Sequence, residues 1–246
     1  MDLTAVKKRD TYYGVMSSDN TAQTQTPLNV GTNVFVFCPT FRDLDTNLAY
    51  SRDRTFTFAK GYKERVFMRT SQPMLWRRIV LWTYDQWYSA VPYRVAEPND
   101  PNEEYYLRRL DKKELFGAQT QVRQQLFRGT SGIDYTNSAL HNARVDRIKN
   151  RVVYDKTINV TPNYDASTDE FGKIIERTQW HPCNKTIIYE DQEEGSSKIG
   201  SGWSSIVRKS AGNMMIVDIM TTGDGGTGTD QCGTVGMHGT YYWHER

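Results

Sequence analysis

Short apolar runs separated by turn-forming residues recur along the chain from residue 33 onward. The run at residues 34–38, Val-Phe-Val-Phe-Cys, stops at Pro39 and is typical of a strand buried on both faces. In the run at residues 75–84, Ile79 and Leu81 alternate with Val80 and Trp82, which predicts opposite faces for the two pairs. Strands are predicted at residues 55–59, 64–69, 75–84, 121–127, 144–157, 174–180, 185–189, 203–208, 214–220 and 240–244.

Two segments depart from this pattern. Residues 1–32 are polar and lack a sustained apolar period, so we expect an arm that lies along the domain or a neighbour. Near residues 100–117, Asp100, Pro101 and Glu103 resemble a helix start with a capping box, and Gly117 can end a helix. A short helical insertion is therefore predicted there.

Many strands and scarcely any helix predict an all-β fold, a sandwich or a barrel. No repeat of fixed period is present, which argues against a propeller or a solenoid. A chain of 246 residues suits one all-β domain, here expected over residues 33–246 after the arm.

Composition adds little evidence for a nucleic-acid partner. The 31 cationic residues against 29 acidic ones leave a net charge of +2, without the basic excess usual for such a protein. Aromatic residues make up 12% of the chain, which favours strands and large contact surfaces. Three cysteines cannot all pair, and no apolar segment suits a signal peptide or a membrane span, so we expect reduced thiols, intracellular synthesis and no membrane partner.

Enzyme and metal signatures are missing. No Gly-x-Ser-x-Gly elbow and no other catalytic constellation occurs, so no enzymatic activity and no cofactor are predicted. His181, Cys183, Cys232 and His238 could be imagined as metal ligands, but their spacing does not match Cys-x-x-Cys knuckles. We interpret them as buried thiols and hydrogen-bonded histidines and predict no metal site.

Basic residues beside aromatic rings carry more information. Lys7, Lys8 and Arg9 precede Tyr12, a combination suited to single-stranded nucleic acid, although an ordinary exposed terminus would look the same.

A second basic cluster follows later in the chain. Arg147, Lys149 and Arg151 recur at every second residue of the strand predicted at 144–157, which would align them as a positive ladder opposite phosphates. Tyr154 and Lys156 follow. A solvated outer face is the alternative interpretation of this ladder.

Six short segments stand out, in this order along the chain: Lys7-Lys8-Arg9-Asp10-Thr11, Pro73-x-x-Trp76-Arg77-Arg78, Leu126-Phe127-Arg128-Gly129, Tyr154-Asp155-Lys156-Thr157, Trp180-His181-Pro182 and Tyr242-Trp243-His244-Glu245-Arg246. Together they resemble the capsid proteins of genomoviruses, the gemycircularvirus-like relatives of geminiviruses. The resemblance covers residues 7–246. One feature differs, because the Arg-rich arm of that family ahead of the Lys-Lys-Arg-Asp-Thr segment is absent here.

The resemblance implies one jelly-roll domain of the eight-stranded viral capsid type. Its copies would form a small icosahedral T=1 shell around circular single-stranded DNA, with the protein in the virion and, during assembly, in the host nucleus. Host nuclear import factors would bind through the basic arm that this chain lacks. The candidate DNA-binding residues on the inner surface are Lys7, Lys8, Arg9, Tyr12, Arg147, Lys149, Arg151, Tyr154 and Lys156.

Two other classes of function stay open at this point. A cellular jelly-roll carbohydrate-binding module would use Trp and Tyr as sugar platforms and would form no shell. A β-sandwich hydrolase with paired carboxylates is disfavoured, because no catalytic constellation is present.

Overall fold

The computed structural model describes residues 5–15, 25–45, 51–97, 100–110, 120–161, 174–194, 197–222 and 230–245. Its helices are α1 (Thr120–Leu126) and the 3₁₀ turns η1 (Tyr88–Ala90) and η3 (Asn137–Ala139). Its strands are β1 (Val6–Val15), β2 (Thr26–Asn29), β3 (Thr32–Phe37), β4 (Phe56–Thr70), β5 (Met74–Thr83), β6 (Tyr93–Glu97), β7 (Asp100–Arg109), β8 (Arg151–Val160), β9 (Ile175–Ile188), β10 (Gln192–Glu194), β11 (Ser197–Ile199), β12 (Asn213–Thr222) and β13 (Gln231–Glu245).

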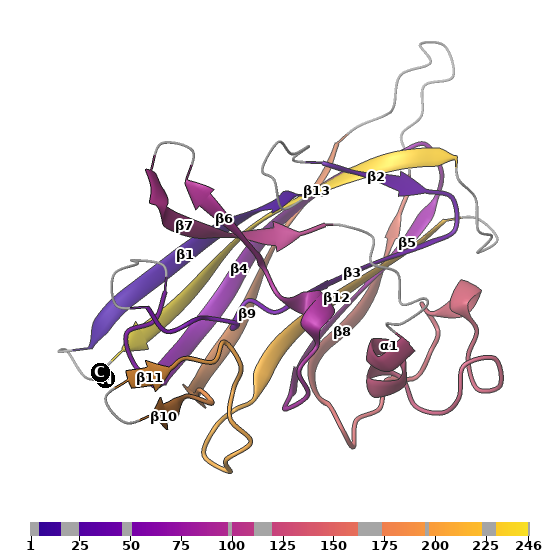
Figure 1. Ribbon diagram of the computed structural model, residues 1–246. Helices are drawn as coiled ribbons and strands as arrows, with labels where there is room; N and C mark the ends of the chain where they lie inside the picture. The colour runs from indigo at the N-terminus through magenta and orange to yellow at the C-terminus, as the bar shows by residue number, and fades with distance from the viewer. Residues whose placement is uncertain are drawn as a thin grey trace.

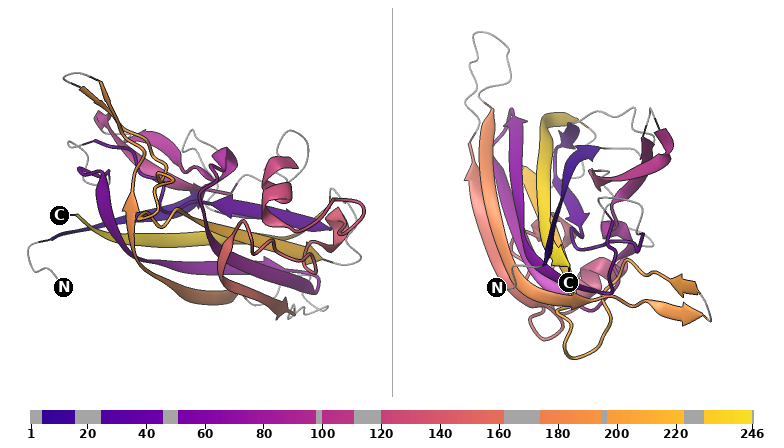
Figure 2. Two further views of the ribbon diagram at one scale, coloured as in Figure 1. Left: turned by 90° about the horizontal axis from the view of Figure 1, so that it is seen from below. Right: turned by 90° about the vertical axis from the view of Figure 1, so that its left-hand side faces the viewer.

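These strands form two main sheets (Figure 1). The β4 sheet has the order β6-β7-β1-β13-β4-β9, with β2 beside β13, and the β5 sheet has the order β3-β12-β5-β8. If β1, β3, β4, β5, β8, β9, β12 and β13 are numbered one to eight along the chain, the sheets read 1-8-3-6 and 2-7-4-5. This is the strand order of a jelly roll, so the predicted fold class is confirmed. A hairpin of β10 and β11 extends away from both sheets (Figure 2).

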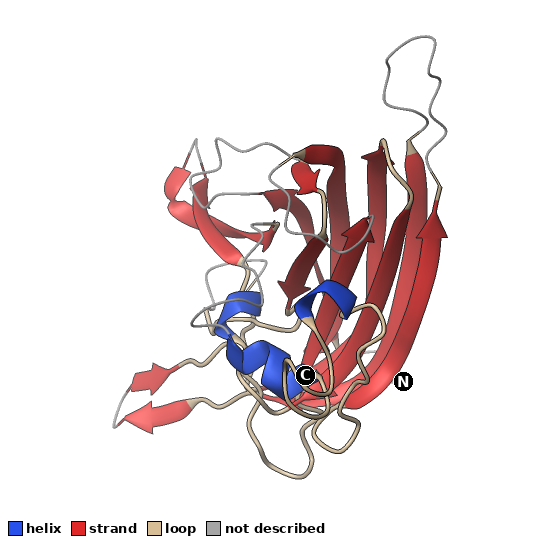
Figure 3. Cartoon of the chain, turned by 90° about the vertical axis from the view of Figure 1, so that its right-hand side faces the viewer, coloured by secondary structure: helices blue, strands red, loops and turns tan. Residues whose placement is uncertain are grey.

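Strands β3, β5 and β12 of the β5 sheet are buried on both faces, whereas the edge strand β8 is partly exposed. Val80 and Trp82 belong to an apolar cluster with Tyr62 and Tyr241 of the β4 sheet, which places this cluster between the sheets. On the opposite face, Ile79 and Leu81 pack in a cluster whose other members come largely from loops and from α1, including Trp87, Leu126, Phe127 and Trp203. The alternation predicted for residues 79–82 is therefore confirmed. Figure 3 shows the helices gathered at one side of the strands.

The prediction of an arm at residues 1–32 is wrong for the part that the structure describes, which contains strands of the β4 sheet. β1 pairs antiparallel with β13 from Val6 opposite Glu245 to Tyr13 opposite His238, and β2 pairs with the start of β13. The inward positions of β1 include Lys8 and Asp10, and such polar residues conceal the two-residue period of a strand. Residues 1–4 and 16–24 lie outside the described part.

Two further predictions are corrected. The prediction of a helical insertion near residues 100–117 is wrong up to Arg109, where the chain forms strand β7. This strand forms a hairpin with β6 that pairs Val95 with Tyr105. Residues 111–119 lie outside the described part. The strand at 121–127 is instead α1, in which Val122 and Leu126, four residues apart, are buried on one side as in a helix. Within the described ranges, no helix is long and apolar enough to cross a membrane.

Strand boundaries also differ from the predictions. The strands predicted at residues 55–59 and 64–69 form one strand, β4. Those predicted at 174–180 and 185–189 likewise form one strand, β9. The pairing of β4 with β9 shifts in register between Ala59 and Gly61. Pro182 is tolerated inside β9 because β9 is an edge strand. The segment at 203–208 forms only an isolated bridge from Ser204 to Tyr189.

Four buried charged side chains join the two sheets. Arg78 of β5 donates to Asp218 of β12 at 2.7 and 2.9 Å and to Glu64 of β4 at 2.5 Å. Arg108 of β7 donates to Asp218 at 2.9 Å and also binds Glu64. All four side chains are fully buried, so two guanidinium groups neutralise two carboxylates inside the sandwich.

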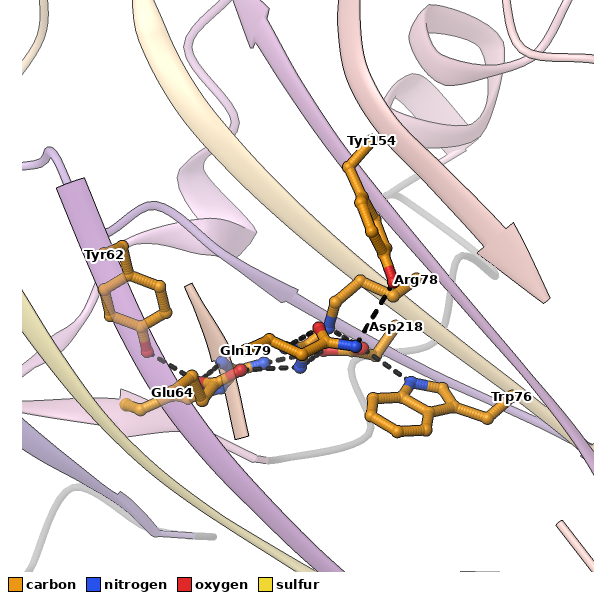
Figure 4. A network of polar contacts seen from close by, with 8 residues as sticks. Tyr62, Glu64, Trp76, Arg78, Tyr154, Gln179 and Asp218 are labelled. Carbon is orange, nitrogen blue, oxygen red and sulfur yellow. Dashed lines mark hydrogen bonds and ion pairs between the residues drawn. The ribbon is translucent and has the colours of Figure 1, made fainter. Parts of the chain in front are cut away.

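Neutral side chains complete this buried ionic network (Figure 4). The Trp76 indole donates to Asp218 at 2.8 Å and the Tyr62 hydroxyl donates to Glu64 at 2.6 Å. Gln179 accepts from Arg78 at 2.9 Å. The network therefore fixes how β4, β5, β7, β9 and β12 lie relative to one another.

His181 of β9 lies beside this network, and we expect it to make the fold sensitive to acid. Burial, and then the positive charge of Arg78, lower its pKa from 6.5 to about 4. The folded state thus favours neutral His181, so its contribution is present above pH 6.5 and is lost as the pH falls from 6.5 to about 4. The loss is about 3 kcal/mol at most.

The measurement is denaturant unfolding of the native chain and of His181→Phe at several pH values between 7 and 4. Phenylalanine keeps a ring against Tyr154, whose centroid lies 5.3 Å from that of His181. Burial raises the pKa of Asp10 to about 6. Protonation of Asp10 therefore stabilises the folded state as the pH falls, which opposes the effect of His181 over the same pH range. The difference between the two proteins isolates His181, and an equal pH dependence in both would contradict the expectation.

Candidate nucleic-acid interface

The outer face of the β4 sheet is the side of β1, β13, β4 and β9 that points away from the β5 sheet. Cross-strand pairing sets its residues in rows: Lys7 with His244, Phe58 and Thr186; Arg9 with Tyr242, Gly61 and Pro182; Thr11 with Thr240, Lys63 and Trp180; Tyr13 with His238, Arg65 and Thr178; and Gly236 with Phe67 and Glu176. The hydroxyls of Thr11 and Thr240 lie 3.1 Å apart, as expected for side chains of one row.

This face is strongly cationic. Its basic residues are Lys7, Arg9, Lys60, Lys63, Arg65 and Arg69. Among the described residues that point outward from these four strands, Glu176 is the only carboxylate. It binds Arg65 through two hydrogen bonds of 2.5 and 2.7 Å, which lower the pKa of Glu176. The other cations of this face form no ion pair among the described residues and are free to bind an external anion.

Aromatic rings lie among the cations. Trp180 is 47% exposed, and its ring meets that of Tyr242 edge to face with centroids 5.9 Å apart. A Cβ atom on Gly61 would come within 2.3 Å of the Trp180 ring, so this ring lies directly over the glycine backbone. Phe67 covers Gly236 in the same way. Glycine at these two positions lets flat rings rest on the sheet, where an unpaired base could stack on them.

A shallow cavity of about 330 Å³ lies in the middle of the face. Lys63, Arg65, His238, Thr240 and Tyr242 are among its lining residues. At the Lys7 end, partial burial, followed by the positive charges of Lys7 and Lys60, lowers the pKa of His244. Positive charge is therefore crowded there as well.

The structure separates the residues predicted near the N-terminus. Lys7 and Arg9 are exposed on the outer face, whereas Lys8 points inward and lies 2.7 Å from a carboxylate oxygen of Asp53. Tyr12 is fully buried, packs against the Arg42 guanidinium and donates to the Pro39 carbonyl oxygen at 3.2 Å. Lys8 and Tyr12 are therefore structural, and their prediction as DNA contacts has no geometric support.

The ladder predicted at Arg147, Lys149 and Arg151 is not a ladder. The Asp146 carboxylate accepts a hydrogen bond of 2.9 Å from the Ile148 amide, which forms a turn, and β8 begins only at Arg151. All three cations nevertheless line one cavity, at a place distinct from the outer face.

Tyr154 and Lys156 lie on β8, in the β5 sheet, and not on the outer face. The Tyr154 hydroxyl accepts a hydrogen bond from Gln179, and the Lys156 ammonium lies 5.8 Å from the Tyr154 ring. Lys156 is exposed. The structure therefore does not bring these two residues together with Lys7 and Arg9.

The sequence prediction missed most of the outer face. The missed residues are Lys60, Lys63, Arg65, Arg69, Trp180 and Tyr242. Their signal was present in part, since Arg65, Phe67 and Arg69 alternate within residues 64–69, which were predicted as a strand.

The cysteines are free and buried in separate apolar clusters: Cys38 in one, Cys183 in a second and Cys232 in a third. Within the described ranges, no three His, Cys, Asp or Glu residues are grouped so that they could hold a metal ion.

Comparison with known proteins adds only distant similarity. No protein-family model and no curated protein matches the chain. The VP1 pentamer of Human Polyomavirus 6 is 10% identical over 99% of this chain and 94% of its own, with a TM-score of 0.19. VP1 of Trichodysplasia spinulosa-associated polyomavirus is 7% identical over 96% of this chain and 76% of its own, with a TM-score of 0.12. The fold assignment rests on the strand order of this chain itself.

Proposed function

We propose that this chain is a viral coat protein of the genomovirus type. Its copies assemble into a small icosahedral shell that encloses circular single-stranded DNA, in the virion and, during assembly, in the host nucleus. The observation that carries the proposal is the outer face of the β4 sheet, where cations from β1 and β4 lie among aromatic rings from β4, β9 and β13.

This face suits a single strand of nucleic acid without a preferred sequence. Cations such as Arg9, Lys63 and Arg69 can pair with successive phosphates, while Trp180 and Tyr242 offer rings for unpaired bases. A coat must package most of its genome without reading it, so contacts with phosphates and base faces are the appropriate chemistry.

Contacts between copies would come from the other side of the domain. Loops around the β5 sheet expose large apolar side chains: Tyr88 is 71% exposed, Ile133 83% and Ile206 77%. Repeating one such contact in closed symmetry gives a stable particle from modest individual interfaces.

The test combines assembly with DNA binding by the full chain. We expect closed particles of uniform size by electron microscopy and light scattering when circular single-stranded DNA is added. We also expect fluorescence anisotropy to give a logarithmic salt dependence of the association constant with a slope of about −3.5, for about five phosphate contacts.

Two results would contradict the proposal. One is a protein that stays small in solution, with and without DNA. The other is DNA affinity that does not change with salt. Binding to a glycan array without binding to DNA would instead favour the carbohydrate-binding module, because Trp180 and Tyr242 could also receive sugar rings.

A further inference from the structure

A second group of cations converges on a cavity of about 660 Å³, here called the basic cavity. It is lined by the end of β5, the turn before β8, part of β9 and the turn before β12. Its six cationic residues are Arg147, Lys149, Arg151, Lys185, Arg208 and Lys209. None of the described residues that line it is acidic.

The charges of the basic cavity are not neutralised by the protein. Within the described ranges, none of the six cations takes part in an ion pair. Like charges held together without a counter-charge repel one another, so an anion that enters the cavity gains from all of them.

The turn that carries Arg147 and Lys149 is held in place. Besides the Ile148 amide, the Asp146 carboxylate accepts from the Lys149 amide at 3.4 Å. The side chain of Asn150, which is almost fully buried, donates to the Gln125 carbonyl oxygen at 2.6 Å and ties the turn to α1.

The turn that carries Arg208 and Lys209 is anchored as well. The Ser210 hydroxyl lies 2.6 Å from the Ser204 hydroxyl and accepts from the Ile188 amide at 2.9 Å. Tyr84 donates to the Ser210 carbonyl oxygen at 2.7 Å. Both turns therefore present their cations from fixed backbones, which lowers the entropy lost on binding.

Lys185 is a lining residue of the basic cavity whose side chain is only partly exposed. Its ammonium is 5.7 Å from the centre of the Trp82 ring, and Trp82 is almost fully buried. Burial, and then the positive charge of Arg151, lower the pKa of Lys185. The surroundings therefore disfavour the positive charge of Lys185, and a negatively charged ligand would stabilise it.

We propose that the basic cavity binds a small ligand with two or more linked phosphate groups, such as a nucleoside triphosphate or inorganic tripolyphosphate. The volume of about 660 Å³ suits one compact ligand. Linked phosphates match a cluster of cations that converge from several segments. A DNA strand instead requires cations along a track, as on the outer face of the β4 sheet. The proposal does not depend on the proposed function, because it concerns a different set of residues.

The test is isothermal titration calorimetry of the full chain with sodium tripolyphosphate and, separately, with ATP in 0.15 M salt. We expect saturable binding of one ligand per chain. Equal affinity for both ligands would assign recognition to the phosphates alone, and tighter binding of ATP would add a nucleoside contact. Substituting both Lys149→Ala and Arg208→Ala should weaken binding about 30-fold, since each is an exposed cation whose charged contact is lost.

The matched control is the pair Arg128→Ala and Arg144→Ala, which removes two exposed cations outside the basic cavity and should leave the affinity unchanged. Equal weakening in both double variants would overturn the proposal, as would the lack of saturable binding. Displacement of tripolyphosphate by an oligonucleotide without terminal phosphates would overturn it too, because the cavity would then belong to the DNA interface.

Discussion

Substitution of Asp218 by alanine is expected to lower the free energy of unfolding by about 3–5 kcal/mol. Asp218 accepts hydrogen bonds from Arg78, Arg108 and Trp76 inside the sandwich. Its removal leaves two fully buried guanidinium groups with Glu64 as the one remaining carboxylate of the network. An uncompensated buried charge is more costly than the loss of an apolar contact of similar size.

Equilibrium unfolding in urea at pH 7 measures this effect. The matched control is Glu176→Ala, which breaks the Arg65–Glu176 pair on the surface, where the side chains are 61% and 45% exposed. This control should cost about 1 kcal/mol or less. Equal losses in the two variants would show that the buried ionic network does not hold the sheets together.

Removing charge and stacking from the outer face of the β4 sheet is expected to weaken binding of single-stranded DNA about 100-fold in 0.15 M salt. The variant combines Lys63→Ser, Arg69→Ser and Trp180→Ala. Loss of two phosphate contacts should also reduce the steepness of the logarithmic salt dependence by about 1.4. The rest of the effect comes from the lost base contact of Trp180, which is 47% exposed.

Fluorescence anisotropy with a labelled oligonucleotide measures both quantities. The matched control combines Arg128→Ser, Arg144→Ser and Tyr88→Ala, which removes two exposed cations and one exposed ring from the loops beside the β5 sheet. Because net charge changes equally in both variants, a similar weakening would mean that DNA responds to overall charge and not to this face.

The strands of the core could be predicted from the sequence because their local pattern and their environment agree. Residues 214–220 are apolar apart from Asp218 and lie in β12, which is buried along its whole length, and alternation in residues 79–82 predicted their two faces correctly. β1 could not be recognised, since its inward positions Lys8 and Asp10 are charged. Lys8 forms ion pairs with Asp53 and Glu245, and Asp10 forms one with Arg42, so both charges can lie inside the fold. Such partners are distant in sequence.

The candidate site was predicted in part for the same reason. Lys7 and Arg9 were found because they are adjacent to Lys8 in a visible basic cluster. Lys63, Arg69 and Trp180 come from two strands that are paired only in three dimensions, so a search for local clusters missed them. The cations at 147–151 line one cavity, but an Asp146 turn and not the predicted strand brings them together.

The position of β13 has a consequence for synthesis of the chain. β13 lies between β1 and β4 in the β4 sheet. β1 and β4 are synthesised early and β13 last, so the β4 sheet can be completed only when β13 has been made. Until β13 is made the β4 sheet is incomplete, and because β13 is distant in sequence from both β1 and β4, these pairings form slowly. A chain that stops before residue 231 lacks the strand that pairs with both β1 and β4. Incomplete translation products are thereby kept out of any assembly that requires the finished sheet.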